Sequence, residues 1–160
     1  MSCRVVAVVT VALGLTACAM MAPLEQRTSQ GPTAEELWIY RMVLQNGREP
    51  NFDEKRHWQD DTDQRISDYL RAHPEAASSL EGSTFRFYRR ATVGMSKEQL
   101  LILLGPPAGI ATDAGEMEKI ARRYWPTMRG NVTEAWVYPL GWSFYFAGSR
   151  IVEITQYLPR

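Results

Sequence analysis

A short helix with firmly marked ends, between Ser96 and Gly105, is the feature that most constrains how this chain folds. Ser96 followed three residues later by Gln99 is a capping box, in which each side chain satisfies a backbone N–H that the first helical turn leaves unpaired. Gly105 suits a left-handed cap at the C-terminal end, and the two prolines after it prevent the helix from continuing. A helix of about nine residues is not stable alone in water, so it has to be docked on another part of the fold.

The apolar side of this helix indicates how it docks. Leu100, Leu103 and Leu104 recur at the spacing of one helical face, whereas Lys97 and Glu98 point elsewhere. We expect this leucine stripe to lie on a β-sheet. On these residues alone, the helix is a core element without reactive groups.

The N-terminal residues have the pattern of a secretory signal. Arg4 precedes an apolar run over residues 5–15, which is about half the ~20 residues needed to cross a bilayer. The run ends in Leu-Thr-Ala-Cys, which resembles the lipobox of bacterial lipoproteins, where a dedicated peptidase cuts before a lipid-modified cysteine. We therefore predict a lipoprotein signal peptide over residues 1–17 and a lipidated Cys18 as the mature N-terminus. An ordinary signal peptide cut nearby and an uncleaved anchor are the alternatives.

Lipidation of Cys18 predicts a stable attachment to a membrane, whose lipid is the first expected partner. Each buried methylene contributes about 0.8 kcal/mol, so one acyl chain binds reversibly, whereas the several chains of a bacterial lipoprotein anchor stably. Ala19 stands where an aspartate would resemble an inner-membrane retention signal, so the resemblance implies the outer membrane, with the protein facing the periplasm. Residues 18–32 mix Met, Pro, Gln, Ser and Gly without a period and predict a flexible tether of roughly 20 Å.

The charge and cysteine content exclude several classes of protein. Arg4 is the only charged residue among residues 1–17, so the remaining 143 residues carry 17 basic and 18 acidic side chains, a net charge of −1. Without a basic excess, the chain is not expected to bind nucleic acid. Cys3 leaves with the signal and Cys18 carries lipid, so the mature chain has neither a disulfide nor a thiol nucleophile. Its length suits one domain with its own core.

A helical extension is expected over residues 33–84. Thr33 and Glu36 form a second capping box, and Gly47 closes the helix that they open. The apolar face of this helix consists of Leu37, Tyr40, Val43 and Leu44. Trp38 lies off that face, where it either flanks the same core contact or binds a partner.

A polar segment over residues 51–63 raises the question of a metal site. Its candidate ligands, which lie close together in the sequence, are His57, Asp60, Asp61 and Asp63. Imidazole and carboxylates are ordinary metal ligands, but Asp and Thr are also favoured just before a helix. The apolar pattern of Ile66, Tyr69 and Leu70 predicts such a helix, beginning after Thr62. We therefore favour helix capping and predict no metal.

A basic surface is a further candidate. Residues 85–90 alternate as in a strand, with Phe85 and Phe87 on one side. The arginines of this part of the chain and of a later segment are Arg86, Arg89, Arg90, Arg122, Arg123 and Arg129. Together they either meet anionic lipid headgroups or form a solvated face on which they pair with the equally numerous acids.

The C-terminal third predicts a three-stranded antiparallel meander. Its strands are expected over residues 133–138, 142–146 and 151–157, because these alternate and are joined by short turns. Residues 85–160 then form an α+β domain of two layers, with helices packed on the meander. Both sheet faces carry apolar residues, so the face away from the helix either packs against residues 33–84 or is left for a partner. The candidate partner surface consists of Trp136, Tyr138, Tyr145 and Tyr157, together with Arg86, Arg89 and Arg90.

A family resemblance rests on the residues around the short helix. The motif residues are Gly94, Met95, Ser96, Gln99, Leu100, Leu104, Gly105 and Pro107. With the later Trp-Val-Tyr strand at residues 136–138 and the glycine hairpin, this motif resembles the SmpA/OmlA (BamE-like) lipoprotein domain, over residues 88–157. The resemblance implies helices against a three-stranded sheet, a place on the periplasmic face of the outer membrane and a role in envelope integrity, in some members as an accessory of β-barrel assembly. The small fold also resembles the repeats of β-lactamase inhibitor proteins, and residues 33–84 have no counterpart in the family.

The sequence predicts no catalytic function and no cofactor. It contains no G-x-S-x-G elbow, no paired histidines and no glycine-rich phosphate loop, and the Gly-Pro-Pro after the short helix is a cap and stop. We expect a non-catalytic outer-membrane lipoprotein that acts through contacts with an outer-membrane or periplasmic protein, with the β-barrel assembly machinery as one such partner. The alternative is a periplasm-facing binding or inhibitor-like module for a lipid, a small ligand or a hydrolase.

Overall fold

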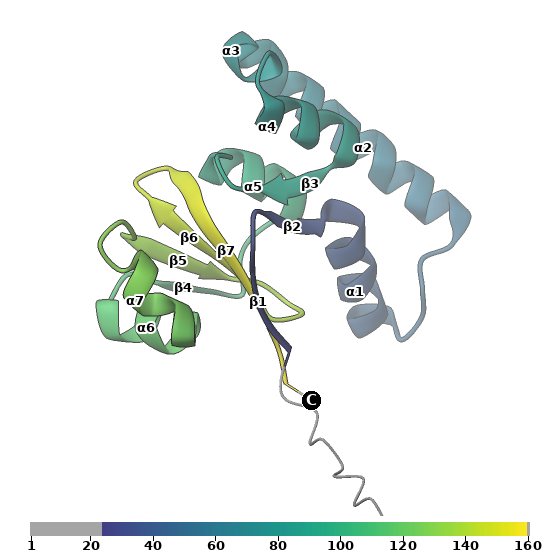
Figure 1. The fold of residues 1–160 in the computed structure, drawn as a ribbon. Helices are drawn as coiled ribbons and strands as arrows, with labels where there is room; N and C mark the ends of the chain where they lie inside the picture. Colours follow the sequence, from purple (N-terminus) through teal and green to yellow (C-terminus); the bar gives the residue numbers. More distant parts are fainter. Residues whose placement is uncertain (1–23, 160) are drawn as a thin grey trace, which may run out of the picture.

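The fold of this protein, in a computed structural model that describes residues 24–159, combines a five-stranded antiparallel sheet with helices on both of its faces (Figure 1). The sheet has the order β1-β7-β6-β5-β4, with β1 Leu24–Thr28, β4 Gly109–Ala111, β5 Glu134–Val137, β6 Trp142–Ala147 and β7 Arg150–Leu158. A second sheet pairs β2 Gln30–Thr33 with β3 Arg90–Thr92. The helices are α1 Ala34–Asn46, α2 Phe52–Ala72, α3 Pro74–Ala77, α4 Leu80–Ser83, α5 Lys97–Leu104, α6 Ala114–Ala121 and α7 Trp125–Met128. A π-helical turn, η1, covers Thr84–Tyr88, and a 3-10 turn, η2, covers Arg122–Tyr124.

The predicted α+β class is confirmed, and the predicted meander is the centre of a larger sheet. Strands β5, β6 and β7 follow one another through short turns, and β4 and β1 extend the sheet at its two edges. The prediction of a flexible tether is wrong for residues 24–32, which form β1 and part of β2; the rest of the predicted tether lies outside the described residues. The free edge of the nine-residue β7 supplies backbone partners to β1, and the Gln26 side chain donates to the Gln156 amide oxygen at 2.7 Å.

Both predicted capping boxes are present. The Thr33 hydroxyl accepts from the Glu36 backbone N–H at the start of α1, and the Ser96 hydroxyl accepts from that of Gln99 at the start of α5. Gly47 ends α1 in the left-handed region at a φ of 68°, and Gly105 follows α5 at a φ of 69°. Both φ values favour glycine, because a Cβ disfavours this conformation.

The second helix begins earlier than predicted. α2 is 21 residues long and starts after Asn51, whose side chain accepts from the Glu54 N–H while Glu54 accepts from the Asn51 N–H. Thr62, predicted to lie before the helix, is buried in its middle. The prediction is wrong because a complete capping box at Asn51 opens the helix, so the later aspartates are exposed residues within the helix and do not cap it.

The strand predicted over residues 85–90 is also wrong. Thr84–Tyr88 form the π-helical turn η1, and Arg89 takes a left-handed φ of 44° before β3 begins. Phe85 is fully buried and meets the ring of Tyr69 edge-on at 5.4 Å. Phe87, which the alternating pattern places on the same side as Phe85, is exposed. The segment therefore forms a turn that buries Phe85 alone against α2.

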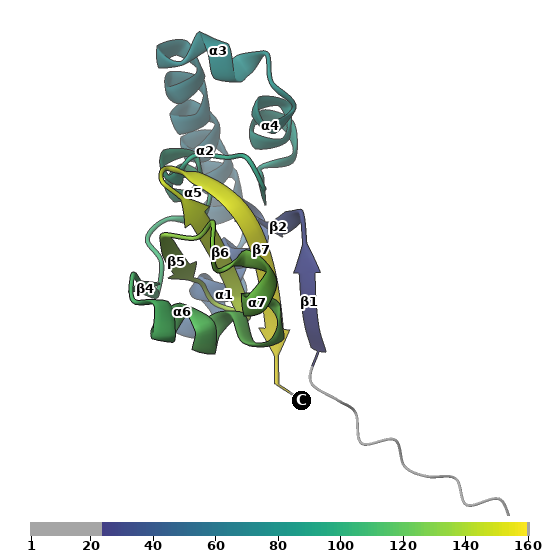
Figure 2. The same cartoon turned by 60° about the vertical axis from the view of Figure 1, so that its left-hand side comes forward.

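The core lies on both sides of the main sheet. On the first face, residues of α1, α2 and α5 pack on the aromatic residues of β5 and β6; examples are Leu37, Ile66, Leu100, Trp136, Phe144 and Phe146. On the second face, Met117, Trp125 and Met128 of α6 and α7 cover Ala135 and Tyr145. Figure 2 shows α7 in front of the strands and α1 behind them. The two-layer prediction therefore becomes three layers, and neither expected alternative for the second face is right, because residues 114–128 cover it.

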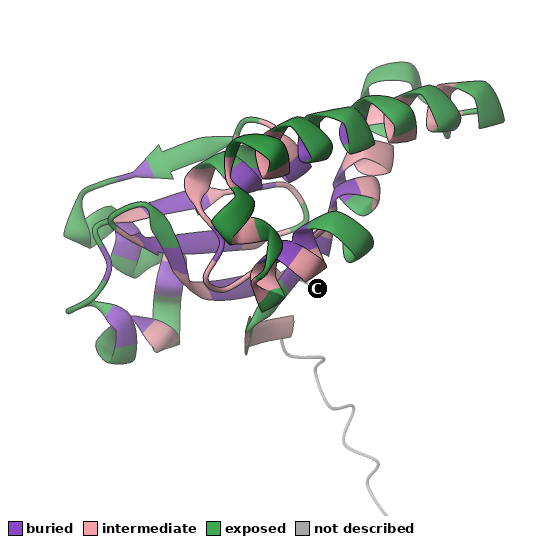
Figure 3. Ribbon diagram, turned by 90° about the horizontal axis from the view of Figure 1, so that it is seen from above, coloured by how far each residue is buried: buried purple, intermediate pink, exposed green. Residues whose placement is uncertain are grey.

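Residues 33–84 share the first core with the rest of the chain. Ala34, Leu37 and Ile66 from this segment pack in the same cluster as the motif leucines of α5. The outer side of α2 remains exposed along its length, as Figure 3 shows for the long helix. The segment thus adds helices to the domain and presents a large part of its surface.

Candidate functional site

The motif residues around α5 hold the fold together and present nothing reactive. Gly94 turns the chain at a φ of 95°, and Met95, Leu100 and Leu104 are buried in the first core. The buried Gln99 side chain accepts from the Ser96 N–H at 2.8 Å. Cys18, the predicted lipidation site, lies outside the described residues.

The C-terminal end of α5 is tied to α1 and to the sheet. Arg41 of α1 donates to the backbone oxygens of Leu104 and Pro106, and the Tyr138 hydroxyl donates to the Gly105 oxygen at 2.8 Å. These donors satisfy carbonyl groups that a helix end leaves unpaired. Burial raises the pKa of Tyr138 well above its usual value, which keeps this hydroxyl protonated and able to donate.

Most of the sheet residues predicted to form a partner surface are buried. Trp136 is 6% exposed, Tyr138 2% and Tyr145 0%, so the prediction of a free aromatic sheet face is wrong. The Tyr145 hydroxyl lies 3.1 Å from the Thr155 hydroxyl, and burial raises the pKa of Tyr145 to about 12. Tyr157 alone of the four is half-buried, and the guanidinium of Arg122 lies 3.6 Å from its ring centroid. An alternating strand does not reveal which helices will cover it. Trp136 and Tyr138 lie in the first core with residues of α1 and α5, and Tyr145 lies under α6 and α7.

The predicted arginine patch is split between different parts of the fold. Arg89 binds both carboxylate oxygens of Asp63 on α2, with its Nε at 2.9 Å from Oδ1, and Arg90 donates to the Gly31 oxygen at 2.9 Å. Arg86 is exposed beside them.

The arginines of the later segment lie elsewhere, on β7 and β1. The guanidinium of Arg122 lies over the Tyr157 ring, and Arg123 pairs with Glu25 at 3.1 Å. Of the two expected alternatives, pairing with acids is therefore confirmed for Arg89 and Arg123, and the arginines do not form one continuous patch.

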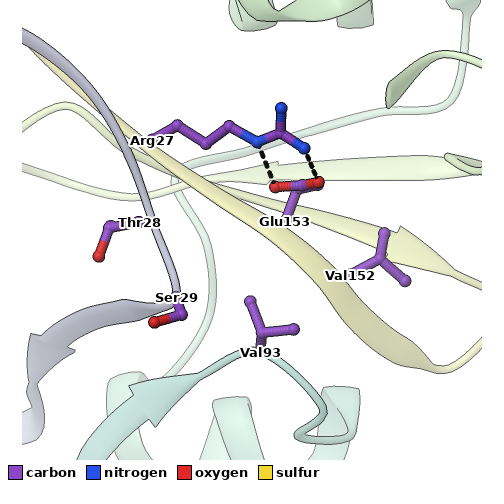
Figure 4. A pocket seen from close by; sticks show the side chains of 6 residues that line it. All are labelled: Arg27, Thr28, Ser29, Val93, Val152 and Glu153. Atoms are coloured by element: carbon purple, nitrogen blue, oxygen red, sulfur yellow. Dashed lines mark hydrogen bonds and ion pairs between the residues drawn. The ribbon is translucent and has the colours of Figure 1, made fainter. Parts of the chain in front are cut away.

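A hollow of about 360 Å³ lies where β1 leaves β7 and turns into β2 (Figure 4). Its walls are Arg27, Thr28, Ser29, Val93, Val152 and Glu153. Arg27 forms a bidentate ion pair with Glu153 and donates to the Thr127 hydroxyl at 3.0 Å. The charged residues of this hollow, Arg27 and Glu153, are bonded to each other, which leaves no charge for a ligand. The bond from Arg27 to Thr127 also ties α7 to the sheet.

A second hollow, of about 240 Å³, combines aromatic and cationic groups between α1, α2 and α5. Trp38 of α1 and Trp58 of α2 stack at a centroid distance of 4.7 Å, with 15° between their planes. We call this site the tryptophan–arginine hollow; its lining residues are Ala34, Trp38, Arg41, Trp58, Arg65, Ile102, Leu103, Leu104 and Gly105. Trp38 was noted from the sequence as lying off the apolar face of its helix. Trp58 was missed, although Trp58, Thr62 and Ile66 recur every four residues once α2 begins at Phe52.

The polar residues that the sequence offers as metal ligands lie along α2, where His57, Asp60 and Asp61 are exposed and Asp63 pairs with Arg89. His57 is within 3.4 Å of Asp61, one helical turn away, and both side chains are mostly exposed. Among residues 24–159, no group of three or more potential ligand residues is placed to hold a metal ion. In the same range, no helix is both long enough and apolar enough to cross a membrane.

Comparison of the chain with protein-family models, with curated proteins and with solved structures finds no match. The SmpA/OmlA (BamE-like) resemblance therefore remains an expectation from the motif. The contacts, burial and charges of the described residues are therefore the basis for the proposed function.

An ion pair between α5 and β5 predicts a pH-dependent contribution to stability. Burial alone raises the pKa of Glu134, but hydrogen bonds donated by Lys97 and by the Trp136 indole lower it by more, so its pKa is below the usual value. A lowered native pKa stabilises the fold above the unfolded value of about 4.3, and this stabilisation is lost as the pH falls through the native pKa. We expect Glu134→Gln to lower the urea midpoint clearly at pH 7 and less at the most acidic pH at which the fold persists.

The matched control for this pair is Glu118→Gln, which changes an exposed glutamate on α6. It is expected to leave the urea midpoint unchanged at both pH values. A loss in Glu134→Gln that is equal at both pH values would show that the carboxylate charge is not what stabilises the contact.

Proposed function

We propose that this protein is a non-catalytic, lipid-anchored lipoprotein of the outer membrane that supports envelope integrity by binding a periplasmic or outer-membrane protein, with service to β-barrel assembly as one form of this role. The observation that best supports the proposal is the arrangement of the chain. β1 begins at Leu24, six positions after Cys18, and this end of the sheet lies opposite the end where α3 and α4 lie (Figure 1). The proposal thus gives membrane attachment and partner binding to different parts of the domain.

The short distance in sequence between Cys18 and β1 limits how far the domain can move from the membrane. A residue spans at most ~3.3–3.6 Å, so six residues reach about 20 Å. An anchor at Cys18 therefore holds the start of β1 beside the headgroups. Because α3 and α4 lie at the other end of the domain from the start of β1, their exposed surface and that of α2 stay accessible to a partner.

Replacing Cys18 tests the anchor directly. Cys18→Ala is expected to abolish incorporation of radiolabelled palmitate and to release the protein from the membrane fraction, because two or more acyl chains are needed for stable attachment. Cys3→Ala, which changes the only other cysteine, should leave both incorporation and membrane association unchanged. Label that persists in Cys18→Ala would refute lipidation at this residue.

Affinity purification from detergent-solubilised outer membranes tests the partner class. Recovery of β-barrel assembly components with the chain supports the assembly role. Recovery of other envelope proteins restricts the proposal to envelope integrity. A co-purifying lipid or hydrolase without envelope proteins would contradict the proposal and favour the binding or inhibitor-like alternative.

A further inference from the structure

The tryptophan–arginine hollow has a rigid aromatic wall. The stack of Trp38 on Trp58 joins α1 to α2, and one turn away the Lys55 ammonium pairs with the Glu35 carboxylate at 2.6 Å across the same two helices. Both indole rings are half-buried, so part of their apolar surface faces the hollow. Tryptophan held in one orientation loses little conformational entropy on binding, and for this reason it is enriched among the residues that dominate binding energy at protein interfaces.

The same hollow carries positive charge without a carboxylate. Arg41 uses two of its N–H groups on the backbone oxygens of Leu104 and Pro106, and Arg65 donates from Nη2 to the Thr62 hydroxyl at 3.2 Å. Within residues 24–159, neither arginine forms an ion pair with an acidic side chain, and no Asp or Glu lines the hollow. A guanidinium has five N–H donors, so both groups have donors left for an incoming carboxylate.

We propose that the tryptophan–arginine hollow binds an acidic peptide segment of the partner protein, in which an aromatic side chain packs on the indoles and a neighbouring carboxylate binds Arg65 and Arg41. Charge complementarity selects an acidic segment. The volume selects one side chain over a small-molecule ligand, since about 240 Å³ is below the usual ~300–1,000 Å³ of ligand pockets. This inference names the kind of partner in the proposed function and rests on it.

Peptide binding to the full chain in detergent tests the inference. The probes are three fluorescein-labelled, glycine-flanked peptides: Glu-Phe-Glu, Glu-Ala-Glu and Lys-Phe-Lys. Fluorescence anisotropy is expected to show binding of Glu-Phe-Glu, with the other two at least about tenfold weaker. Glu-Ala-Glu lacks the aromatic ring that packs on the indoles, and Lys-Phe-Lys lacks the carboxylates that bind the arginines. Binding of Glu-Phe-Glu should also weaken as salt is raised, since exposed charges are screened.

Two charge-matched variants localise the binding. Arg65→Glu is expected to weaken Glu-Phe-Glu binding by about tenfold or more, because it places a negative charge in the hollow that repels the carboxylates of the peptide. Arg56→Glu makes the same change nine residues earlier, about two and a half turns away on the opposite side of α2, and should leave binding unchanged. Equal far-UV circular dichroism of the two variants shows that the helix is intact in both.

The outcomes separate this inference from the proposed function. Equal binding of the three peptides, equal loss in both variants, or affinity weaker than about 1 mM would overturn it. Competition by anionic lipid vesicles that depends on Arg65 would assign the hollow to the membrane and overturn it as well. The Cys18→Ala chain should bind Glu-Phe-Glu normally, so a failure of lipidation contradicts the proposed function while leaving the peptide result in place.

Discussion

Phe144→Ala is expected to lower the free energy of unfolding by about 3–5 kcal/mol, the usual cost of emptying a buried aromatic site. Phe144 on β6 is 0% exposed and meets the Tyr138 ring edge-on at 5.4 Å. Its ring also packs on the chain at β2, where a Cβ added to Gly31 would lie 3.0 Å from it. Because both sheets and α5 share this cluster, the cavity has little room to collapse. Urea denaturation followed by circular dichroism measures the loss.

Phe87→Ala is the matched control, because it removes the same side chain from a site that is 70% exposed. It is expected to change the unfolding free energy by no more than about 0.5 kcal/mol. A similar loss in both variants would mean that the first core is not the cooperative centre of the fold. An unchanged Phe144→Ala would show that the neighbouring rings refill the site.

The features that could be predicted from the sequence are local ones. The capping boxes at Thr33 and Ser96 act within one helical turn, so four residues contain all the information needed to place each helix start. The β5–β6–β7 meander is likewise built from neighbouring strands with short turns. In the candidate site, Trp38 was recognisable because it departs from the helical pattern around it.

The features that escaped prediction depend on residues far apart in the chain. β1 has little strand pattern of its own and is ordered by pairing with β7, where Leu24 lies opposite Leu158. The cover of Tyr145 by Trp125 and Met128 is equally remote from any local pattern. The start of α2 is the exception, because its capping box at Asn51 is local. A helix predicted to begin after Thr62 leaves out Trp58, which is one half of the aromatic stack in the tryptophan–arginine hollow.

Gly141→Ala is expected to destabilise the protein by about 2–5 kcal/mol, because it combines two costs. Gly141 has a φ of 73°, where a Cβ is strained by roughly 1–2 kcal/mol. An added Cβ would also lie 1.7 Å from the Tyr157 backbone oxygen, and the Tyr157 N–H donates to the Gly141 oxygen at 3.0 Å. The turn between β5 and β6 must therefore move away from the end of β7.

Gly148→Ala separates the two costs, because Gly148 has a similar φ of 62° but no atom within 4 Å of an added Cβ. It should cost only about 1–2 kcal/mol of unfolding free energy, and the excess loss in Gly141→Ala measures the clash alone. Equal losses would show that the β5–β6 turn moves away from Tyr157 with no loss of unfolding free energy.

The clash at Gly141 occurs one residue from Leu158, which pairs with Leu24. Hydrogen exchange should therefore also increase along β1 in Gly141→Ala and not in Gly148→Ala. Increased exchange in β1 would show that the sheet end next to the proposed anchor depends on the close packing of this turn.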